Sequence, residues 1–488
     1  MESTNRQSQI ISTGAVGNIE CGLSRREFIG DCVVCAAGLA GVSALATATA
    51  SAAAQITIPA DKAKVRLVFT HIDPGSPTWP NIGYDYEGRK KDLLNKLTKG
   101  CPNIEFMPAT AKNSDDAKKI LEGDKDVDGY MVYMVGIWTG APQAIIASGR
   151  PTLLVDDLYG GTGEFLIAYA AAKRQGQKVA GVSSTRIEDV VQAAKCFECI
   201  KKLRSSVIVQ VGSGFGSAAG DIEKVFGTKV VSATHSQLDE LYKKADRTEA
   251  RKWAQQWIKS AEKIVEPSKD EIEKSGAMYL AMLEMMNQNN AQAITVNCLG
   301  GFYGGHITAY PCLGFLQLNN DGFVGACEAD LRSTITMLLM TYLVGRPGYI
   351  SDPAIDTSKN RIIYAHCVAP TKVFGPSGPS NPYHIRSHSE DRKGAAVRSL
   401  MPLGEMTTTL AFEPGSRQVV IHQAKSVENV DEDKACRTKL ACEVKGDIDK
   451  LLSYWDQWGW HRVTYYGDLK RPVEQIAGLL GFKVVEEA

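Results

Sequence analysis

The chain has 488 residues, a formal net charge of zero and a hydrophobic content of 44%. That length is enough for two or three domains with cores of their own. The neutral balance, without a sustained basic stripe, gives no electrostatic reason to expect nucleic acid or an anionic membrane as a partner.

A twin-arginine export signal is predicted over residues 1–54. The motif Ser24-Arg-Arg-Glu-Phe-Ile29 precedes a stretch of small apolar residues from Cys32 to Ala54, which is the pattern of such a signal. Glycine and serine residues interrupt this stretch, so it is too weakly apolar for a good membrane span. We expect export to the periplasm and a mature protein without a membrane segment; an Ala-rich tail or a membrane anchor is the alternative.

Strands alternate with helices over the next two thirds of the chain. Strand patterns occur at 64–70, 103–107, 128–133, 151–156, 178–183, 206–211, 229–233 and 293–297. A long polar helical region is predicted at 236–289, with shorter helix patterns elsewhere. This alternation predicts an α/β fold with two Rossmann-like parallel-sheet domains, at 55–175 and 176–345. From about residue 356 strand patterns dominate, so we expect a C-terminal α+β domain at 346–488 with an antiparallel or barrel-like sheet.

The cysteines predict little redox chemistry. Nine of the twelve lie beyond the signal, so at least one stays free or pairs between chains. Cys196 and Cys199 have redox spacing but lie in a helix pattern, which favours thiols that pack between helices. Cys436 and Cys442 could form a local disulfide in the periplasm.

A glycine-rich loop, Gly212-Ser-Gly-Phe-Gly216, follows the strand at 206–211. It lacks the full spacing and the acidic partner of a dinucleotide-binding fingerprint, so a tight turn with helix packing is the better interpretation.

Three segments in the last third carry candidate metal ligands. Glu328 precedes an apolar helix pattern at 331–343, Asp352 follows a short strand at 349–350, and His461 is distant in sequence. Two carboxylates and an imidazole suit a divalent ion such as Mn²⁺, with positions left open for substrate oxygens. On spacing alone, a helix cap at Glu328 and a turn at Asp352 are the alternatives.

The motifs around these residues resemble the C-terminal half of the L-fucose isomerase and L-arabinose isomerase superfamily over roughly residues 290–488. They are Cys327-Glu-Ala-Asp-Leu331, Gly345-Arg-Pro-Gly-Tyr-Ile-Ser-Asp-Pro353 and Trp460-His-Arg-Val-Thr-Tyr-Tyr-Gly-Asp468. The resemblance implies that Glu328, Asp352 and His461 bind manganese or another divalent ion, which holds the carbonyl and adjacent hydroxyl of a sugar. At Trp460 the chain departs from fucose isomerase, which has a polar substrate contact there.

The same resemblance implies several substrate-binding residues. His366, His388 and Glu390 are expected to line the pocket. Trp79 and Asp85 are candidates because their loop lies at the carboxyl end of the first strand, where α/β domains place ligands, and surface packing is the alternative. The resemblance implies that Trp79 reaches the site of a neighbouring subunit in a homotrimer or homohexamer. His306 lies in a glycine-rich crossing that could approach the metal or be structural.

The implied activity is aldose–ketose isomerisation through an enediolate, with Glu328 and Asp352 moving protons. A periplasmic location is unusual for such an enzyme, because the partner kinase needs cytoplasmic ATP. A metal-dependent epimerase or lyase acting on an oxidised sugar or glycoside, and a non-catalytic sugar-binding protein, are therefore the alternatives.

Overall fold

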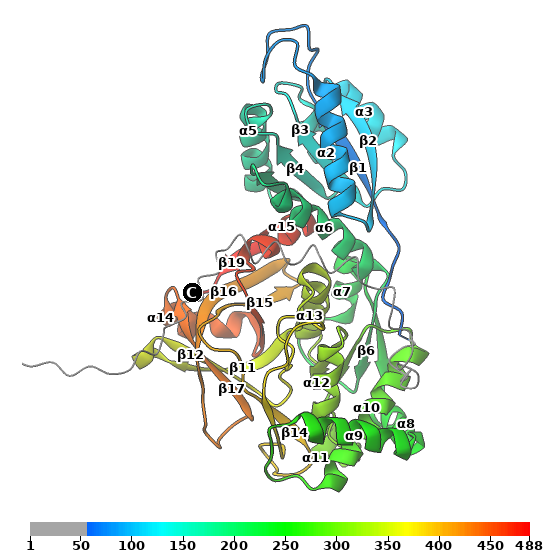
Figure 1. Ribbon diagram of the computed structural model, residues 1–488, viewed down its shortest axis with the longest axis vertical. Coiled ribbons are helices and arrows are strands. Elements are labelled where there is room, and N and C mark those ends of the chain that lie inside the picture. Colours follow the sequence, from blue (N-terminus) through cyan, green and yellow to red (C-terminus); the bar gives the residue numbers. More distant parts are fainter. Residues whose placement is uncertain (1–55) are drawn as a thin grey trace, which may run out of the picture. The chain divides into compact units, whose positions relative to one another are not determined.

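The computed structural model describes residues 56–488, so the predicted export signal lies outside the described residues. Figure 1 shows two parallel sheets, in blue to green, followed in the chain by an antiparallel sheet in yellow to red. Within residues 56–488, no helix is both long and apolar enough to span a membrane. The predicted α/β fold class with a barrel-like C-terminal sheet is confirmed.

The first sheet has five parallel strands in the order β2-β1-β3-β4-β5. The strands are β1 (Ala63–Thr70), β2 (Ile104–Ala111), β3 (Gly129–Met134), β4 (Thr152–Asp156) and β5 (Val179–Ser183). Its helices are α2 (Tyr86–Gly100), α3 (Ser114–Gly123), α4 (Ala141–Ile146) and α5 (Thr162–Arg174). Every residue of β3 is buried, because a central parallel strand is covered on both faces.

The second sheet has four parallel strands in the order β10-β9-β6-β7. They are β6 (Val207–Val211), β7 (Lys229–Ala233), β9 (Ala293–Val296) and β10 (Val324–Cys327). Helix α6 (Ile187–Arg204) packs against strands of the first sheet and against α13. The other helices of this part of the chain are α7 (Ala219–Phe226), α8 (His235–Lys244), α9 (Arg247–Ser260), α10 (Lys269–Gln288), α11 (Cys298–Tyr303), α12 (Cys312–Asn320) and α13 (Leu331–Val344). The predicted helical region at 236–289 is thus three helices, and Asp246 caps the second by accepting from the Thr248 and Glu249 amides.

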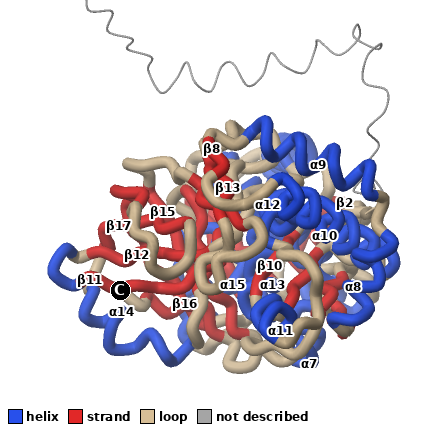
Figure 2. The backbone as a smooth tube through the Cα atoms, turned by 90° about the horizontal axis from the view of Figure 1, so that it is seen from below, coloured by secondary structure: helices blue, strands red, loops and turns tan. Residues whose placement is uncertain are grey.

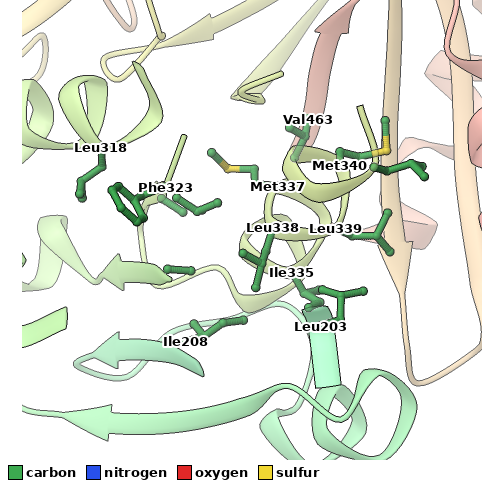
Figure 3. Close-up of a cluster of buried hydrophobic side chains, with 14 of the residues drawn as sticks. Leu203, Ile208, Leu318, Phe323, Ile335, Met337, Leu338, Leu339, Met340 and Val463 are labelled. Atoms are coloured by element: carbon green, nitrogen blue, oxygen red, sulfur yellow. The ribbon is translucent and has the colours of Figure 1, made fainter. Parts of the chain in front are cut away.

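Helix α13 is buried on almost every side, as expected of a helix that is apolar all round. Figure 3 shows Ile335, Met337, Leu338, Leu339 and Met340 pointing outward from it into a continuous apolar cluster. Strand β18 of the C-terminal sheet contacts this helix, as does β10 of the second sheet. The turn before α13 is therefore held firmly between two parts of the fold.

The third sheet has the order β15-β18-β11-β12-β17-β16-β19, and an added β15–β16 pairing closes six antiparallel strands into a barrel. Figure 2 shows these strands in red beside the helices of the second sheet. They are β11 (Tyr349–Asp356), β12 (Arg361–His366), β15 (Met406–Glu413), β16 (Gln418–Asn429), β17 (Thr438–Lys445), β18 (Arg462–Tyr466) and β19 (Lys483–Glu486). The remaining elements are α14 (Ile448–Tyr454), α15 (Lys470–Leu480), two 3₁₀ turns (Thr357–Lys359 and Trp455–Trp458), and a small sheet of β8 (Lys263–Ile264), β13 (Tyr383–Arg386) and β14 (Ala396–Ser399). The domain limits at 175 and 345 stay predictions.

Two local predictions are wrong. Asp352 lies inside β11 rather than in a turn, opposite Ala365 of β12. The following Pro353 lies opposite Tyr364 of β12, at a point where the pairing of β11 with β18 has already ended at Ser351.

The expected disulfide between Cys436 and Cys442 is also absent, since both are free thiols. Cys442 lies within β17, next to Thr407, whereas Cys436 lies beside Asp352. The extended backbone of β17 separates the two, so closeness in sequence does not bring them together. Cys196 and Cys199 are buried in α6, as predicted.

Candidate metal centre

Glu328 occupies a sharp turn between β10 and α13. Both Glu328 and Ala329 have left-handed backbone conformations, with φ of 62° and 50°. Such angles cost about 1–3 kcal/mol per non-glycine residue and persist only where the surroundings impose them. The next residue, Asp330, caps α13 by accepting from the Arg332 and Ser333 amides. Glu328 is therefore not the helix cap, and its carboxylate is free for another role.

The glycine-rich loop after β6, at 212–216, packs closely against this turn. The Leu331 amide donates to the Phe215 carbonyl over 3.3 Å. A Cβ on Gly214 would overlap the Ala329 carbonyl oxygen, and one on Gly216 would overlap the Asp330 carboxylate. The glycines thus allow close approach to the turn that carries Glu328, rather than forming a cofactor-binding turn.

The three predicted ligands meet although they come from distant segments. The Nε2 of His461, directly before β18, lies 3.5 Å from Glu328 Oε2 and 3.0 Å from Asp352 Oδ1. The His461 side chain is fully buried, and those of Glu328 and Asp352 are 20% and 23% exposed. Neither carboxylate aligns as a hydrogen-bond acceptor for Nε2, so this atom has no hydrogen-bond partner.

Asp330 sets the orientation of His461. The Nδ1 of His461 lies 3.1 Å from Asp330 Oδ2, and because a carboxylate only accepts, Nδ1 carries the hydrogen. When the ring is neutral, as a metal ligand must be, its lone pair is at Nε2, which faces Glu328 and Asp352. A carboxylate behind a histidine in this way is the usual support of a metal ligand. Sequence analysis missed Asp330, although it lies within the motif at 327–331 that identified Glu328.

A buried ion pair supports His461 from the barrel side. Arg462 donates to the Glu487 carboxylate over 3.0 Å and to backbone carbonyls of the segment before it, including those of Trp458 and Gly459. The His422 Nδ1 lies 2.9 Å from the same carboxylate. Burial raises the pKa of Glu487, but Arg462 and His422 outweigh it and hold this pKa below its usual value.

His366, at the end of β12, faces the same centre in a different tautomer. The Cys367 amide donates to its Nδ1 over 3.0 Å, so this nitrogen holds the lone pair. Burial holds the pKa of His366 below its usual value, so the ring is neutral and Nε2 carries the hydrogen. That Nε2 is buried without a hydrogen-bond partner, 3.7 Å from Glu328 Oε1. His366 therefore offers the centre an N–H donor, whereas His461 offers a lone pair.

The arrangement has the chemistry of a cation site. Atoms of Asp352, His366 and His461 that could bind a metal lie within 4.8 Å of one another, although His366 in the tautomer described above presents an N–H instead of a lone pair. Burial lowers the pKa of His461, but the carboxylates of Asp330 and Asp352 outweigh it and raise this pKa to about 10. The carboxylates thus favour a positive charge at Nε2, which a divalent ion would also satisfy. Oxygen and imidazole donors suit Mn²⁺ or a similar ion.

Comparison with known proteins finds similarity to sugar isomerases. No protein-family model matches the chain. It is 22% identical over 310 residues to a sulfoquinovose isomerase of Clostridium sp. (strain MSTE9), covering 60% of this chain and 67% of that protein. It is 20% identical over 298 residues to the sulfoquinovose isomerase of Alkalicoccus urumqiensis (59% and 65% covered), and 20% over 302 residues to that of Priestia aryabhattai (60% and 66%).

The chain is thus similar, at low identity, to sulfoquinovose isomerases over about 60% of its length. The matched regions span about two thirds of these relatives' own lengths. The name of these relatives denotes isomerases of sulfoquinovose.

A second polar cluster, consisting of Tyr303, Tyr310, His388, Glu390 and Asp391, lies near His366. The Tyr303 hydroxyl donates to Glu390 and the Tyr310 hydroxyl to Asp391. His388 is buried, with Nδ1 3.3 Å from Asp391 Oδ1. The predicted residues His388 and Glu390 thus have local partners, and the two tyrosines were missed because they lie about 80 residues away in the chain.

The other predicted residues lie in different surroundings. Asp85 caps α2 by accepting from the Gly88 amide, so its carboxylate has a structural role. Trp79 is 53% exposed in the loop after β1. His306 stacks on His235 with ring centroids 5.9 Å apart, and His235 contacts the Asn297 carbonyl. These contacts place His306 beside α8 and α11 rather than against the three candidate ligands.

Proposed function

We propose that this protein is a metal-dependent sugar isomerase whose centre consists of Glu328, Asp352 and His461. The observation that carries the proposal is the unpartnered Nε2 of His461, fixed by Asp330 and facing two carboxylates. Its relatives are named as isomerases of a sugar, and the donor set suits the ion that such chemistry uses.

A bound divalent ion would polarise the sugar's carbonyl and adjacent hydroxyl, which lowers the cost of removing a carbon-bound proton. Glu328 and Asp352 would hold the ion together with His461. One of the two carboxylates takes the proton from carbon 2 of the open-chain aldose and returns it to carbon 1. The proton of the hydroxyl on carbon 2 moves to the oxygen on carbon 1, so aldose and ketose have the same composition.

His366 is the second participant that we propose. Its Nε2–H points into the centre without a partner and is available to a sugar oxygen that gains negative charge in the enediolate. A donor that is already oriented loses no energy in reorganising during the reaction.

The test is isomerisation by the Mn²⁺-loaded protein, followed by NMR in heavy water with sulfoquinovose, D-glucose, L-fucose and a 3-keto-glycoside. Exchange of a carbon-bound proton together with a ketose product is expected. Release of an eliminated group or formation of an epimer would instead establish the lyase or epimerase alternative. If no sugar shows exchange, the enzymatic proposal is wrong and the sugar-binding alternative gains support.

A matched pair of variants checks the role of the carboxylate. Glu328→Gln keeps the size of the side chain but cannot accept a proton, so we expect a folded protein without turnover. Glu390→Gln, in the second cluster, should keep measurable turnover. A Glu328→Gln variant with near-normal rate would remove Glu328 from the mechanism.

We further propose that the protein is exported by the twin-arginine route and functions in the periplasm as a homotrimer or homohexamer. The exposed Trp79, at the carboxyl edge of the first sheet, is available to complete a neighbour's site. Mixing Trp79→Ala with His461→Ala protein should restore part of the activity in hybrid oligomers. A fully active monomer in light scattering would contradict the shared site, and cytoplasmic retention of the tagged chain would contradict export.

A further inference from the structure

Phe215 is a large apolar side chain left exposed beside the polar centre. It is 45% exposed, and its ring lies 5.3 Å from that of His461, tilted by 34°. Single exposed apolar residues are common on protein surfaces, so exposure alone carries no conclusion. Phe215 differs from such residues because its ring lies against His461, a candidate metal ligand.

The backbone holds Phe215 firmly in this position. Its carbonyl accepts from the Leu331 amide over 3.3 Å, and the Asn297 side chain donates to the carbonyl of Ser213. The flanking glycines lie so close to the turn before α13 that no side chain would fit between. A loop attached at so many points presents its one large side chain in a defined place.

The centre also offers polar groups, and the exposed Trp460 directly precedes His461. Glu328, Asp352 and His366 supply charges and a hydrogen-bond donor, which match the hydroxyl groups of a sugar. A sugar also has patches of C–H bonds that prefer an apolar, aromatic surface to water. Phe215 supplies such a surface next to His461.

We propose that Phe215 is a specificity-determining residue that forms the apolar wall of the substrate site and stacks on the C–H face of the bound sugar. This inference rests on the proposed sugar isomerase function. The ring contributes to binding the sugar before and during the reaction to the same extent, since it does not touch the atoms that exchange protons. It therefore acts on affinity and on the choice of sugar rather than on the rate of the chemical step.

The experiment compares Mn²⁺-loaded wild type with Phe215→Ala, Phe215→Leu and Phe215→Tyr. Calorimetry measures binding of sulfoquinovose, D-glucose and L-fucose, and steady-state kinetics separate KM from kcat. We expect Phe215→Ala to raise Kd and KM about tenfold while kcat stays within about threefold, because lost uniform binding changes KM alone. Phe215→Tyr keeps the ring and should resemble wild type, and Phe215→Leu should fall between them.

Leu452→Ala is the control, because Leu452 is an exposed apolar residue of α14, 57% accessible, and should change nothing. Metal content is measured for every variant. If Phe215→Ala loses metal, the sugar affinity of Phe215→Leu is compared with that of wild type instead. Unchanged sugar affinity in a metal-loaded Phe215 variant would overturn the inference. If wild type binds none of the three sugars, the proposed isomerase function is wrong. If wild type and variant bind a sugar equally well, only the role of Phe215 is wrong.

Discussion

Replacing His366 tests the assignment of tautomers at the centre. Its Nδ1 accepts from the Cys367 amide over 3.0 Å, so its Nε2 carries a hydrogen and has no lone pair for a metal. His366→Ala should therefore leave the metal content of the purified protein unchanged. His461→Ala should lose the metal, because the Nε2 that faces Glu328 and Asp352 is the lone-pair atom.

The magnitude of the effect on rate follows from the unpartnered Nε2–H of His366. Removing one oriented donor from a developing oxyanion costs about 10²–10³ in kcat, or about 3–4 kcal/mol. His366→Gln places an amide N–H near the position of Nε2, so it should recover part of that loss. Thermal unfolding is measured for both variants, because replacing His366 removes the Nδ1 that accepts from the Cys367 amide.

The assay combines elemental analysis of metal after dialysis with initial rates on the sugar that wild type isomerises. Nitrogen NMR of the imidazole rings checks the tautomers directly. Loss of metal from His366→Ala to the extent seen with His461→Ala would refute the reasoning, because it would make His366 a ligand. A normal rate in His366→Ala would refute the donor role while leaving the tautomer assignment standing.

Three further predictions concern the support of the centre. Gly214→Ala should destabilise the protein by about 2 kcal/mol or more in thermal unfolding and reduce bound metal, because its Cβ would overlap the turn that carries Glu328. Gly220→Ala is the control and should leave thermal unfolding unchanged, since there is open space around Gly220. Asp330→Asn keeps a side chain that caps α13 but weakens the hydrogen bond that orients the imidazole of His461. Metal affinity measured by chelator competition should therefore fall about 10–100-fold. An unchanged affinity would contradict this role of Asp330. Glu487→Gln breaks the buried pair with Arg462 and should cost about 3 kcal/mol at neutral pH in urea unfolding. Folding lowers the pKa of Glu487, so its carboxylate stabilises the folded protein fully at a pH above the pKa of an ordinary glutamate. This stabilisation is lost as the pH falls through the pKa of Glu487 in the folded protein. Glu487→Gln should therefore lose less stability in acid than wild type.

Local patterns in the sequence predicted most strands of the two parallel sheets but missed β10, the short strand directly before Glu328. The apolar runs that became β1, β3 and β9 are bounded by polar or turn-forming residues, so their type depends mainly on neighbours in sequence. The alternation of these strands with helices predicted parallel sheets, and the later strand-rich segment predicted the barrel. The candidate ligands came from the resemblance of three motifs, because spacing alone favoured a helix cap at Glu328 and a turn at Asp352.

The remaining features of the centre depend on contacts that no local pattern contains. Asp330 and His461 are 131 residues apart, and their contact decides which imidazole nitrogen faces the carboxylates. Phe215 reaches His461 only because the loop after β6 meets the turn after β10 at one edge of the second sheet. Asp352 belongs to a strand because β12 pairs with it, although Asp-Pro favours a turn in isolation. Residue types and spacing thus determined the elements and the chemistry available, whereas the folded chain decided which atoms face one another, since tertiary contacts override local preference.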